Sequence, residues 1–193
     1  MGKQTKIIIG IAGKNGSGKD TAADYLVEKY HAHKLVFSDL LNEALSVFIE
    51  KIGREDNAWL STNLRSRFGD GVLSAGMKKK IDSSKSSLIV ISGFRDLGEL
   101  AMLREYPGGI LLYVSADIRT RWERITKRAV KADDQVSFEQ FANEKEKLPS
   151  EQYIEQLGEA ADFKVANDGT REQLAKQIDT IMVSLEKRFE NVK

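Results

Sequence analysis

The sequence predicts a three-layer α/β fold, in which a five-stranded parallel sheet is covered by helices on both faces. Short apolar runs rich in β-branched residues alternate along the chain with longer segments of helical periodicity. These runs lack alternating polar residues, which is typical of strands buried on both faces. At 193 residues the chain is long enough for one well-buried core, so we expect a single domain.

The N-terminal part is expected to form two strands and two helices. The first strand is KIIIGI, at residues 6–11, and a glycine-rich loop follows it. From Asp20 the pattern is helical, with these apolar residues at helix spacing: Ala22, Ala23, Leu26, Val27 and Tyr30. After a short strand at 34–37, Ser38 or Asp39 can cap a second helix. Its apolar stripe would consist of Leu40, Leu41, Leu45, Val47, Phe48 and Ile52.

The middle of the chain is polar at first and then returns to buried strands. Residues 53–85 are predicted to contain short helices near 58–68 and 71–81. A strand, a helix and a further strand are then expected at 88–91, 97–105 and 110–114.

The C-terminal part begins with a strongly basic helix at 118–128. Two capping boxes, S-F-E-Q from Ser137 and T-R-E-Q from Thr170, mark the starts of later helices. The last strand is expected at 163–166. A final helix would seal the sheet with an apolar face of Leu174, Ile178, Ile181, Met182 and Leu185.

The composition excludes several classes of function. The chain has no cysteine and only two histidines, which excludes disulfides and thiol catalysis and disfavours a histidine-built metal centre. Thirty basic and 29 acidic residues give a net charge of +1, which argues against nucleic acid or an anionic membrane as partner. The N-terminal apolar run is too short to span a bilayer, so we expect a cytoplasmic protein. No feature of the sequence indicates an oligomeric state.

The strongest functional signal is the segment after the first strand. Gly13, Lys14, Asn15, Gly16, Ser17, Gly18 and Lys19 match the pattern G-x-x-x-x-G-K, between a predicted strand and a predicted helix. Glycines allow backbone N–H groups to converge on phosphate oxygens, and the helix that follows adds its positive N-terminal end. Lys19 supplies a mobile cation for the β- and γ-phosphates. The sequence therefore predicts a P-loop that binds a nucleoside triphosphate, with ATP expected as phosphate donor.

The residue after the lysine departs from the usual P-loop. A serine or threonine normally ligates Mg²⁺ from this position, whereas this chain has Asp20, followed by Thr21. A carboxylate would repel the triphosphate unless a cation lies between them. We therefore expect Asp20 to contact Mg²⁺ directly or through water, with Thr21 nearer the α-phosphate. Alternatively, Asp20 points away and only stabilises the N-terminal end of the helix.

With GKNGSGKDT identified, the chain resembles the nucleoside monophosphate kinase group, and more closely dephospho-CoA kinase-like or nucleotide kinase-like P-loop proteins. GSGKDT is also similar to the loop of phage deoxynucleoside monophosphate kinases. The resemblance extends over nearly the whole chain. The further segments that carry it are Leu64-Arg65 with Phe68-Gly69, Ile91 to Asp96 with Glu99 and Leu103-Arg104, Tyr113 to Asp117 with Arg121, Arg124 and Arg128, Phe138 and Phe141 with Glu144, and Ala161 to Gly169.

The resemblance implies a domain organisation, and at one position the chain departs from the pattern of the group. A core at 1–38, 85–117 and 148–193 would carry an acceptor-binding helical insertion at 39–84 and a lid at 118–147. At Ser92 the group usually has an aspartate that helps to hold Mg²⁺ from the end of the central strand. This difference gives more weight to Asp20, Asp39 or Asp96 in metal binding.

Three arginines are spaced to share one face of the basic helix. Arg121, Arg124 and Arg128 are separated by three and four residues. In the resembling adenylate kinases, the arginine at the place of Arg124 covers the nucleotide base, and that at the place of Arg128 reaches the phosphates. Such charge would stabilise the transition state of phosphoryl transfer. The alternative is a solvated basic face balanced by acidic neighbours such as Glu123.

Acceptor binding is assigned to residues at the ends of the second and third strands and in the insertion. Arg65 and Arg95 are candidates for binding the acceptor's phosphate, and Phe94 could pack against its base. Arg121 of the basic helix is a further candidate for acceptor binding. Structural salt bridges are the alternative for both Arg65 and Arg95. In dephospho-CoA kinases an aspartate at the place of Asp39 helps to activate the acceptor hydroxyl, whereas a helix cap is the other role open to it.

The loop after the last strand is assigned to the donor base. In the resembling enzymes, Asn167 and Gly169 would lie in a loop that contacts this base through backbone groups and an amide. The alternative is a turn in which both residues adopt left-handed conformations.

Three functions are consistent with these residues. The first is a kinase that transfers the γ-phosphate of Mg-ATP to a nucleoside or deoxynucleoside monophosphate. The second is a dephospho-CoA kinase, which phosphorylates a ribose hydroxyl. The third is an ATPase or nucleotide-dependent switch without a small-molecule acceptor. A functional Asp39 favours the second, a phosphate-binding Arg65–Arg95 pair favours the first, and Ser92 leaves the third open.

Overall fold

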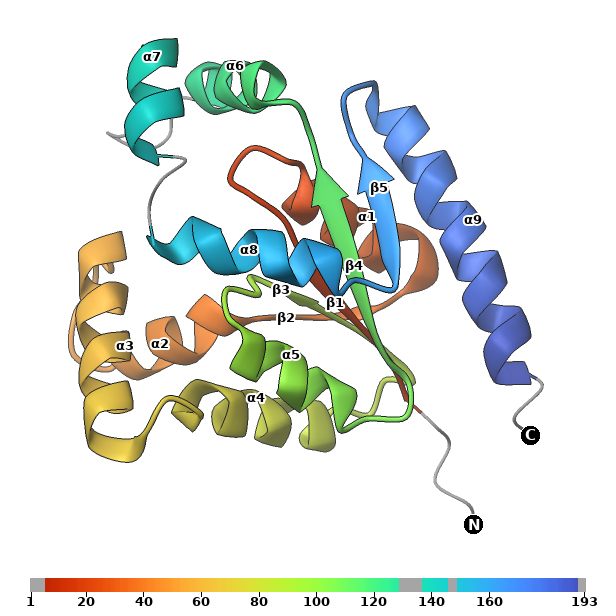
Figure 1. The fold of residues 1–193 in the computed structure, drawn as a ribbon. Helices are drawn as coiled ribbons and strands as arrows, with labels where there is room; N and C mark the ends of the chain where they lie inside the picture. Colours follow the sequence, from red (N-terminus) through yellow and green to blue (C-terminus); the bar gives the residue numbers. More distant parts are fainter. Residues whose placement is uncertain (1–5, 129–136, 146–148, 191–193) are drawn as a thin grey trace.

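The computed structural model describes residues 6–128, 137–145 and 149–190 (Figure 1). Within this part of the chain, five parallel strands form one sheet in the order β2-β3-β1-β4-β5. The strands are β1 (Ile7–Ala12), β2 (His33–Val36), β3 (Leu88–Ser92), β4 (Gly109–Ser115) and β5 (Phe163–Ala166). The predicted fold class is therefore confirmed. Parts of the expected lid and core, residues 129–136 and 146–148, lie outside the described residues.

Helices connect the strands as the alternating pattern predicts. They are α1 (Lys19–Tyr30), α2 (Phe37–Leu45), α3 (Arg54–Phe68), α4 (Val72–Ser83), α5 (Leu97–Arg104), α6 (Ile118–Arg128), α7 (Phe138–Gln140), α8 (Pro149–Glu159) and α9 (Arg171–Glu190). A π-helical turn, Phe141–Lys145, follows α7. Both predicted capping boxes form, at Ser137 with Gln140 and at Thr170 with Gln173. No helix in the described ranges is long and apolar enough to cross a membrane.

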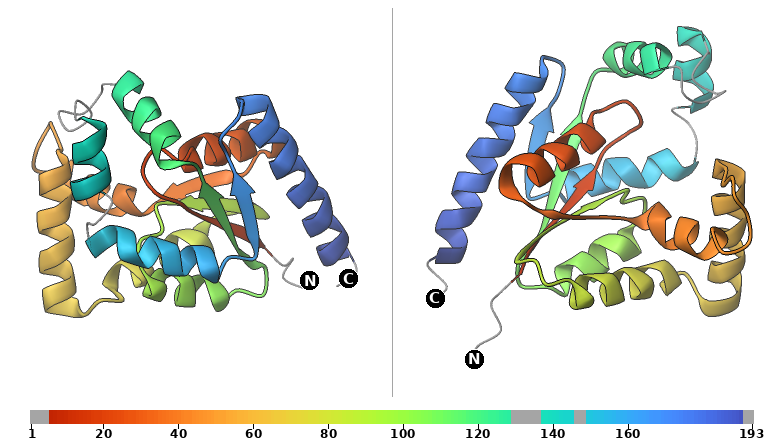
Figure 2. Two further views of the ribbon diagram at one scale, coloured as in Figure 1. Left: turned by 45° about the horizontal axis from the view of Figure 1, so that its top comes forward. Right: turned by 180° about the vertical axis from the view of Figure 1, so that it is seen from behind.

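The sheet separates two apolar clusters, which makes the molecule three-layered (Figures 1 and 2). Alternate residues of β1 point to opposite faces, with Ile8 in one cluster and Ile9 in the other. Helices α2, α4, α5 and α8 cover the face of Ile8, and α1 and α9 cover the face of Ile9. Because both faces are buried, the strands are almost continuously apolar.

Hydrogen bonds at the surface join α1 to α9. Asp179 of α9 accepts hydrogen bonds from the hydroxyls of Tyr25 and Tyr30, at 2.7 and 2.8 Å. Lys29 Nζ donates to the second carboxylate oxygen at 2.8 Å. These contacts raise the pKa of Lys29 and lower that of Asp179, so the pair is charged across the neutral range. The helix that follows the P-loop is thereby attached to the last helix of the fold.

The start of α2 differs from the expectation. Neither Ser38 nor Asp39 caps the helix, which begins at Phe37 after an extended Val36. Phe37 is buried, and its ring packs edge-on against that of Phe94, with the centroids 5.4 Å apart. This contact places Phe37 in the first turn of the helix. The helix also ends at Leu45, and the predicted stripe residues Val47 and Phe48 are exposed.

The predicted insertion is only partly separate from the core. Leu41 of α2 and Leu73, Met77 and Ile81 of α4 belong to the cluster that covers the sheet. None of residues 55–68 of helix α3 is buried, and the helix stands at the opposite end of the molecule from α9 (Figure 1). Leu60 and Leu64 of α3 nevertheless pack against the same cluster, so all three helices of the insertion contact the core.

Helix α8 was missing from the sequence prediction. Ile154 and Leu157 bury its inner face. Gly158 lies flat on the ring of Tyr113, where a Cβ atom would be only 2.9 Å from the ring. The glycine therefore allows α8 to pack closely against β4.

Phe94 is a core residue, and we no longer assign it to acceptor binding. Its side chain is 2% exposed and packs between Phe37 and Gly10, where a Cβ atom would be 2.7 Å from the Phe94 ring. A ring enclosed in this way has no surface to offer an acceptor base.

Replacing Phe94 by alanine should therefore act on stability. We expect Phe94→Ala to lower the free energy of unfolding by about 3–5 kcal/mol, because it empties a packed core site. Leu97→Ala, at a position that is 42% exposed, is the matched control and should change it by about 0.5 kcal/mol or less. Urea titrations of both variants measure the difference. Equal stabilities would contradict the assignment of Phe94 to the core.

Candidate functional site

The P-loop is shaped by glycines that other parts of the protein approach closely. Gly16 and Gly18 have left-handed φ values of 80° and 92°, which favour glycine. A Cβ atom on Gly18 would lie 2.1 Å from Asn167 Nδ2, and one on Gly13 would lie 2.3 Å from the carbonyl oxygen of Val114. The loop is therefore held against β4 and the end of β5. Helix α1 begins directly after the loop, and the N–H groups of its first turn have no partner within the helix. Such a helix start favours the binding of an anion.

Asn167 connects the P-loop to two other elements. Its side chain is 6% exposed, and its amide Nδ2 donates to the Ser17 carbonyl oxygen at 2.8 Å. Its backbone N–H donates to Ser115, and its carbonyl oxygen accepts a hydrogen bond from Arg124 Nη1 at 2.8 Å. The Asn167 amide thus supports the loop, whereas we had expected it to contact the donor base.

A cavity of about 560 Å³ opens beside the loop. It is lined by Asn15, Gly16, Gly18, Lys19, Asp20, Thr21, Arg124, Ile125, Lys127, Arg128, Asn167, Gly169, Arg171 and Leu174. Five of these side chains are basic and one is acidic, so the cavity has a positive potential that suits a polyphosphate. Most of the predicted ATP-binding residues therefore come together in one place. Gly13, Lys14 and Ser17 are not part of the lining.

Lys14 forms an ion pair with α8. Its ammonium group donates to Glu155 of α8 at 2.8 Å, and the lysine side chain is only 15% exposed. The contact attaches the outer part of the P-loop to α8.

The three arginines of α6 do not all line the same cavity. Arg124 and Arg128 line the P-loop cavity. Arg121 is 4% exposed, its Nε donates to the Ala116 carbonyl oxygen at 3.1 Å, and its guanidinium lies 5.7 Å from the centre of the Phe141 ring. Because Arg121 is enclosed between the P-loop and Phe141, we do not assign it to the acceptor.

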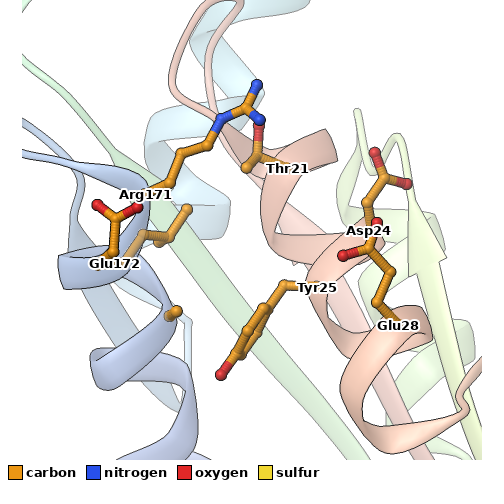
Figure 3. Close-up of a pocket in the computed structure, with 8 residues that line it drawn as sticks. Thr21, Asp24, Tyr25, Glu28, Arg171 and Glu172 are labelled. Atoms are coloured by element: carbon orange, nitrogen blue, oxygen red, sulfur yellow. The ribbon is translucent and has the colours of Figure 1, made fainter.

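Arg171 is a site residue that the sequence analysis missed. It lines the P-loop cavity and also a groove of about 370 Å³ between α1 and α9. Figure 3 shows its side chain reaching across this groove toward Thr21. Asp24, Glu28 and Glu172 make the rest of the groove acidic. The signal in the sequence was its place two residues after Gly169, at the start of the last helix.

The surroundings of Asp20 fit a magnesium ion. Asp20 lies in the first turn of α1, with its side chain 64% exposed. Its Oδ1 accepts a hydrogen bond from the Ser92 hydroxyl at 2.8 Å, and its Oδ2 lies 3.9 Å from Lys19 Nζ. The side chain thus faces the end of β3, beside the phosphate-binding lysine. Carboxylate and hydroxyl oxygens are ligands that Mg²⁺ accepts.

The protein alone offers few metal ligands. Among the described residues, no group of three or more histidine, cysteine, aspartate or glutamate side chains could hold a metal ion. Since Mg²⁺ commonly binds through one or two carboxylates plus substrate phosphates, the ion would arrive with the nucleotide.

A second cavity, of about 440 Å³, lies between α3 and the ends of β2 and β3. It is lined by Val36, Phe37, Ser38, Leu41, Asn57, Ala58, Ser61, Thr62, Arg65, Leu73, Gly93, Arg95 and Glu99. The predicted acceptor residues Arg65 and Arg95 both line it. Asp39 does not: it is exposed, and its carboxylate meets the Asn42 amide at 3.5 Å.

Arg65 joins α3 to the core through acidic groups. Its Nη2 donates to Asp96 Oδ2 at 3.1 Å and lies 3.8 Å from Glu99 Oε1, while Nη1 donates to the Asp70 carbonyl oxygen. The guanidinium that faces the second cavity is therefore paired within the protein. An acceptor phosphate would have to replace these contacts.

Glu99 is the buried carboxyl of this cluster, with 2% of the residue exposed. Its Oε2 accepts hydrogen bonds from the backbone N–H groups of Arg95, at 2.5 Å, and Asp96, at 3.2 Å. Burial, together with the neighbouring Asp96 carboxylate, raises the pKa of Glu99 to about 7. The two N–H groups and Arg65 act in the opposite direction. Glu99 therefore changes charge near neutral pH.

Comparison with known proteins gives relatives and structural neighbours. No family model matches the chain. A UPF0200 protein of Hyperthermus butylicus is 30% identical over 137 residues, which cover 70% of this chain and 72% of that protein. A UPF0200 protein of Methanocaldococcus jannaschii is 25% identical over 201 residues, covering 97% of this chain and 94% of that protein.

Two solved structures have a similar fold. TT1252 from Thermus thermophilus has a TM-score of 0.60 and 21% identity, covering 94% of this chain and 98% of that one. Shikimate kinase from Acinetobacter baumannii, solved with shikimate, has a TM-score of 0.56 and 18% identity, covering 94% and 95%. At these identities the neighbours establish the fold, which is that of a P-loop kinase-like protein.

The raised pKa of Glu99 predicts a pH-dependent stability. The folded protein keeps the Glu99 proton up to about pH 7, whereas the unfolded chain loses it near 4.5. The contribution of protonated Glu99 to the free energy of unfolding is therefore complete below pH 4.5 and is lost as the pH rises through 7. A shift of this size corresponds to roughly 3 kcal/mol.

Glu99→Gln should remove most of this dependence, because the amide has no proton to lose. Urea unfolding should show that, from pH 5 to pH 8, the wild-type free energy of unfolding falls by roughly 2–3 kcal/mol more than that of the variant. Glu186→Gln, at an exposed position of α9, should keep the wild-type profile. An unchanged profile in Glu99→Gln would contradict the raised pKa.

Proposed function

This chain belongs to the UPF0200 family, and we propose that it is a phosphotransferase that moves the γ-phosphate of Mg-ATP to a nucleotide-like acceptor. The acceptor that we favour is a nucleoside or deoxynucleoside monophosphate. The observation that carries the proposal is the pair of cavities, a basic one around the P-loop and a second one with two arginines in its lining. Both volumes lie in the range of small-molecule sites.

The donor would bind in the P-loop cavity. The loop N–H groups and Lys19 would hold the β- and γ-phosphates, and Asn15, Gly16 and Gly18 line the same space. Arg124 lies beside the loop after β5, where its guanidinium bonds to the carbonyl oxygens of Asn167 and Gly169. It can cover a base resting on that loop. Arg171 would contact the α-phosphate or the ribose from the other side, next to Thr21.

Transfer would rely on positive charge and on exclusion of water. Arg128 and Lys19 face the same cavity and can stabilise charge on the oxygens of the moving phosphoryl group. Mg²⁺, when bound, would neutralise charge on the β- and γ-oxygens. Asp20, held by Ser92, would be its protein ligand. The predicted lid, of which residues 118–128 and 137–145 are described, would close over the phosphates and prevent hydrolysis.

The second cavity supports an acceptor that is itself a phosphate ester. Arg65 and Arg95 line it, and the polar side chains of Asn57, Ser61 and Thr62 lie along one face of α3. An anionic acceptor oxygen needs no catalytic base. The dephospho-CoA alternative requires a base, and its candidate, Asp39, does not line the cavity. The arrangement therefore favours the monophosphate over the ribose hydroxyl.

An acceptor panel tests the proposal. ADP release from Mg-ATP would be measured with each common nucleoside monophosphate, its deoxy form and dephospho-CoA, for wild type and Lys19→Ala. We expect one monophosphate to raise the rate at least about tenfold, and the variant to give no such response, because it lacks the cation at the transferred phosphate. If ATP binds but no acceptor raises the rate, the kinase proposal is wrong. An ATPase or switch would then replace it.

Two arginine variants test the assignment of the cavities. We expect Arg171→Ala to raise KM for ATP about tenfold and leave KM for the acceptor unchanged. Arg95→Ala should have the reverse effect, because Arg95 lines the second cavity and is not in the lining of the P-loop cavity. Steady-state kinetics with each substrate varied in turn separates the two. Equal effects of both variants on both KM values would contradict the separation of donor and acceptor sites.

A further inference from the structure

The carboxylate and hydroxyl next to the P-loop lysine are exchanged in this protein. In P-loop nucleotide-binding proteins, Mg²⁺ is held by a serine or threonine after the lysine and by an aspartate on another strand. This chain has Asp20 after Lys19, and Ser92 at the end of the adjacent strand β3. The two side chains are in contact, since the Ser92 hydroxyl donates to Asp20 Oδ1 at 2.8 Å. The carboxylate and the hydroxyl are both present, but the negative charge lies in the first turn of α1, next to the P-loop.

We propose that this exchange makes ATP binding conditional on a divalent cation, with Asp20 as the conditional group and Ser92 as its positioning residue. The inference rests on the proposed binding of ATP at the P-loop. In the ordinary arrangement, the residue beside the phosphates is a neutral hydroxyl. Here it is a carboxylate in the first turn of α1, where a triphosphate must approach.

Two effects oppose the binding of ATP in the absence of a divalent cation. The Asp20 carboxylate repels the phosphate oxygens at short range. It also lies 3.9 Å from Lys19 Nζ, so it partly neutralises the cation that should meet the β- and γ-phosphates. A divalent ion bound between Asp20 and the phosphates would reverse the first effect. It would also draw the carboxylate away from Lys19.

Ser92 directs the carboxylate toward this role. Ser92 is 1% exposed at the end of a central strand, so its hydroxyl is fixed by the sheet. By donating to Oδ1, it leaves Oδ2 and a second lone pair of Oδ1 for a metal. Asp20 itself is largely exposed and could otherwise turn toward Lys19.

The alternative is that Asp20 only complements the dipole of α1. That role would be independent of metal, and it would be shared by any acidic group near the start of the helix. Asp24 provides the comparison, because it lies one turn further along α1 and is paired with Lys34 at 2.6 Å.

Calorimetric titration of ATP, once with MgCl₂ and once with EDTA, measures the condition directly. For wild type we expect at least about thirtyfold tighter binding with MgCl₂ than with EDTA. Asp20→Asn should bind about tenfold more tightly than wild type in EDTA and about tenfold more weakly in MgCl₂. Opposite changes under the two conditions are the signature of a conditional ligand. Asp24→Asn removes the same charge one turn away and should leave the ratio of the ATP affinities in MgCl₂ and in EDTA unchanged.

Variants of Ser92 test the positioning role. Ser92→Ala should weaken binding in MgCl₂, because Asp20 is then free to turn toward Lys19, whereas Ser92→Thr, which keeps the hydroxyl, should behave like wild type. The exchange variant Asp20→Ser with Ser92→Asp restores the ordinary arrangement. It should regain tight binding in MgCl₂ and bind ATP in EDTA more tightly than wild type. Thermal unfolding of each variant shows whether the fold is kept.

The outcomes distinguish this inference from the proposed function. If wild type binds ATP equally well under both conditions, or if Asp20→Asn weakens both, the inference is wrong while the kinase proposal stands. If wild type binds no ATP even with MgCl₂, and behaves like Lys19→Ala, the proposed function fails and the inference fails with it.

Discussion

A buried amide at the end of the last strand holds the candidate site together. Asn167 donates to the Ser17 carbonyl oxygen of the P-loop, and its own carbonyl oxygen accepts a hydrogen bond from Arg124 of α6. Gly18 must be a glycine because the Asn167 amide occupies the space of a Cβ atom. One residue therefore couples the phosphate-binding loop, the last strand and the helix that carries the donor-side arginines. The shape of the loop depends on β5 being in register with β4.

The two cavities differ in how their charges are balanced. The P-loop cavity has five basic side chains and one acidic one in its lining, so it is prepared for a polyphosphate. In the second cavity, Arg65 is already paired with Asp96, close to the buried Glu99. Because Arg65 comes from α3 and both acids come from the segment after β3, this ion-pair cluster also attaches α3 to the core. Under the proposed function, acceptor binding and the position of α3 would thus be coupled.

Local patterns in the sequence predicted most of the fold. The β-branched runs identified each strand, and the two capping boxes identified the starts of α7 and α9, because these signals act over a few neighbouring residues. The errors arose where distant residues pack together. At the start of α2, Phe37 packs against Phe94, and in α8, which was not predicted, Gly158 packs on Tyr113. Neither contact leaves a pattern within one segment.

The sequence by itself determined that a phosphate-binding loop lies between a buried strand and a helix, and that a carboxylate follows its lysine. Only the tertiary structure decided which residues share that site. It brought Arg171 to the loop, enclosed Arg121 beneath Phe141, and joined Asp20 to a serine 72 positions away. Spacing along a helix predicts which side chains share a face, but neighbours across a sheet are set by strand order. Because β1 lies between β3 and β4, the loop after β1 meets Ser92 from one side and β4 from the other.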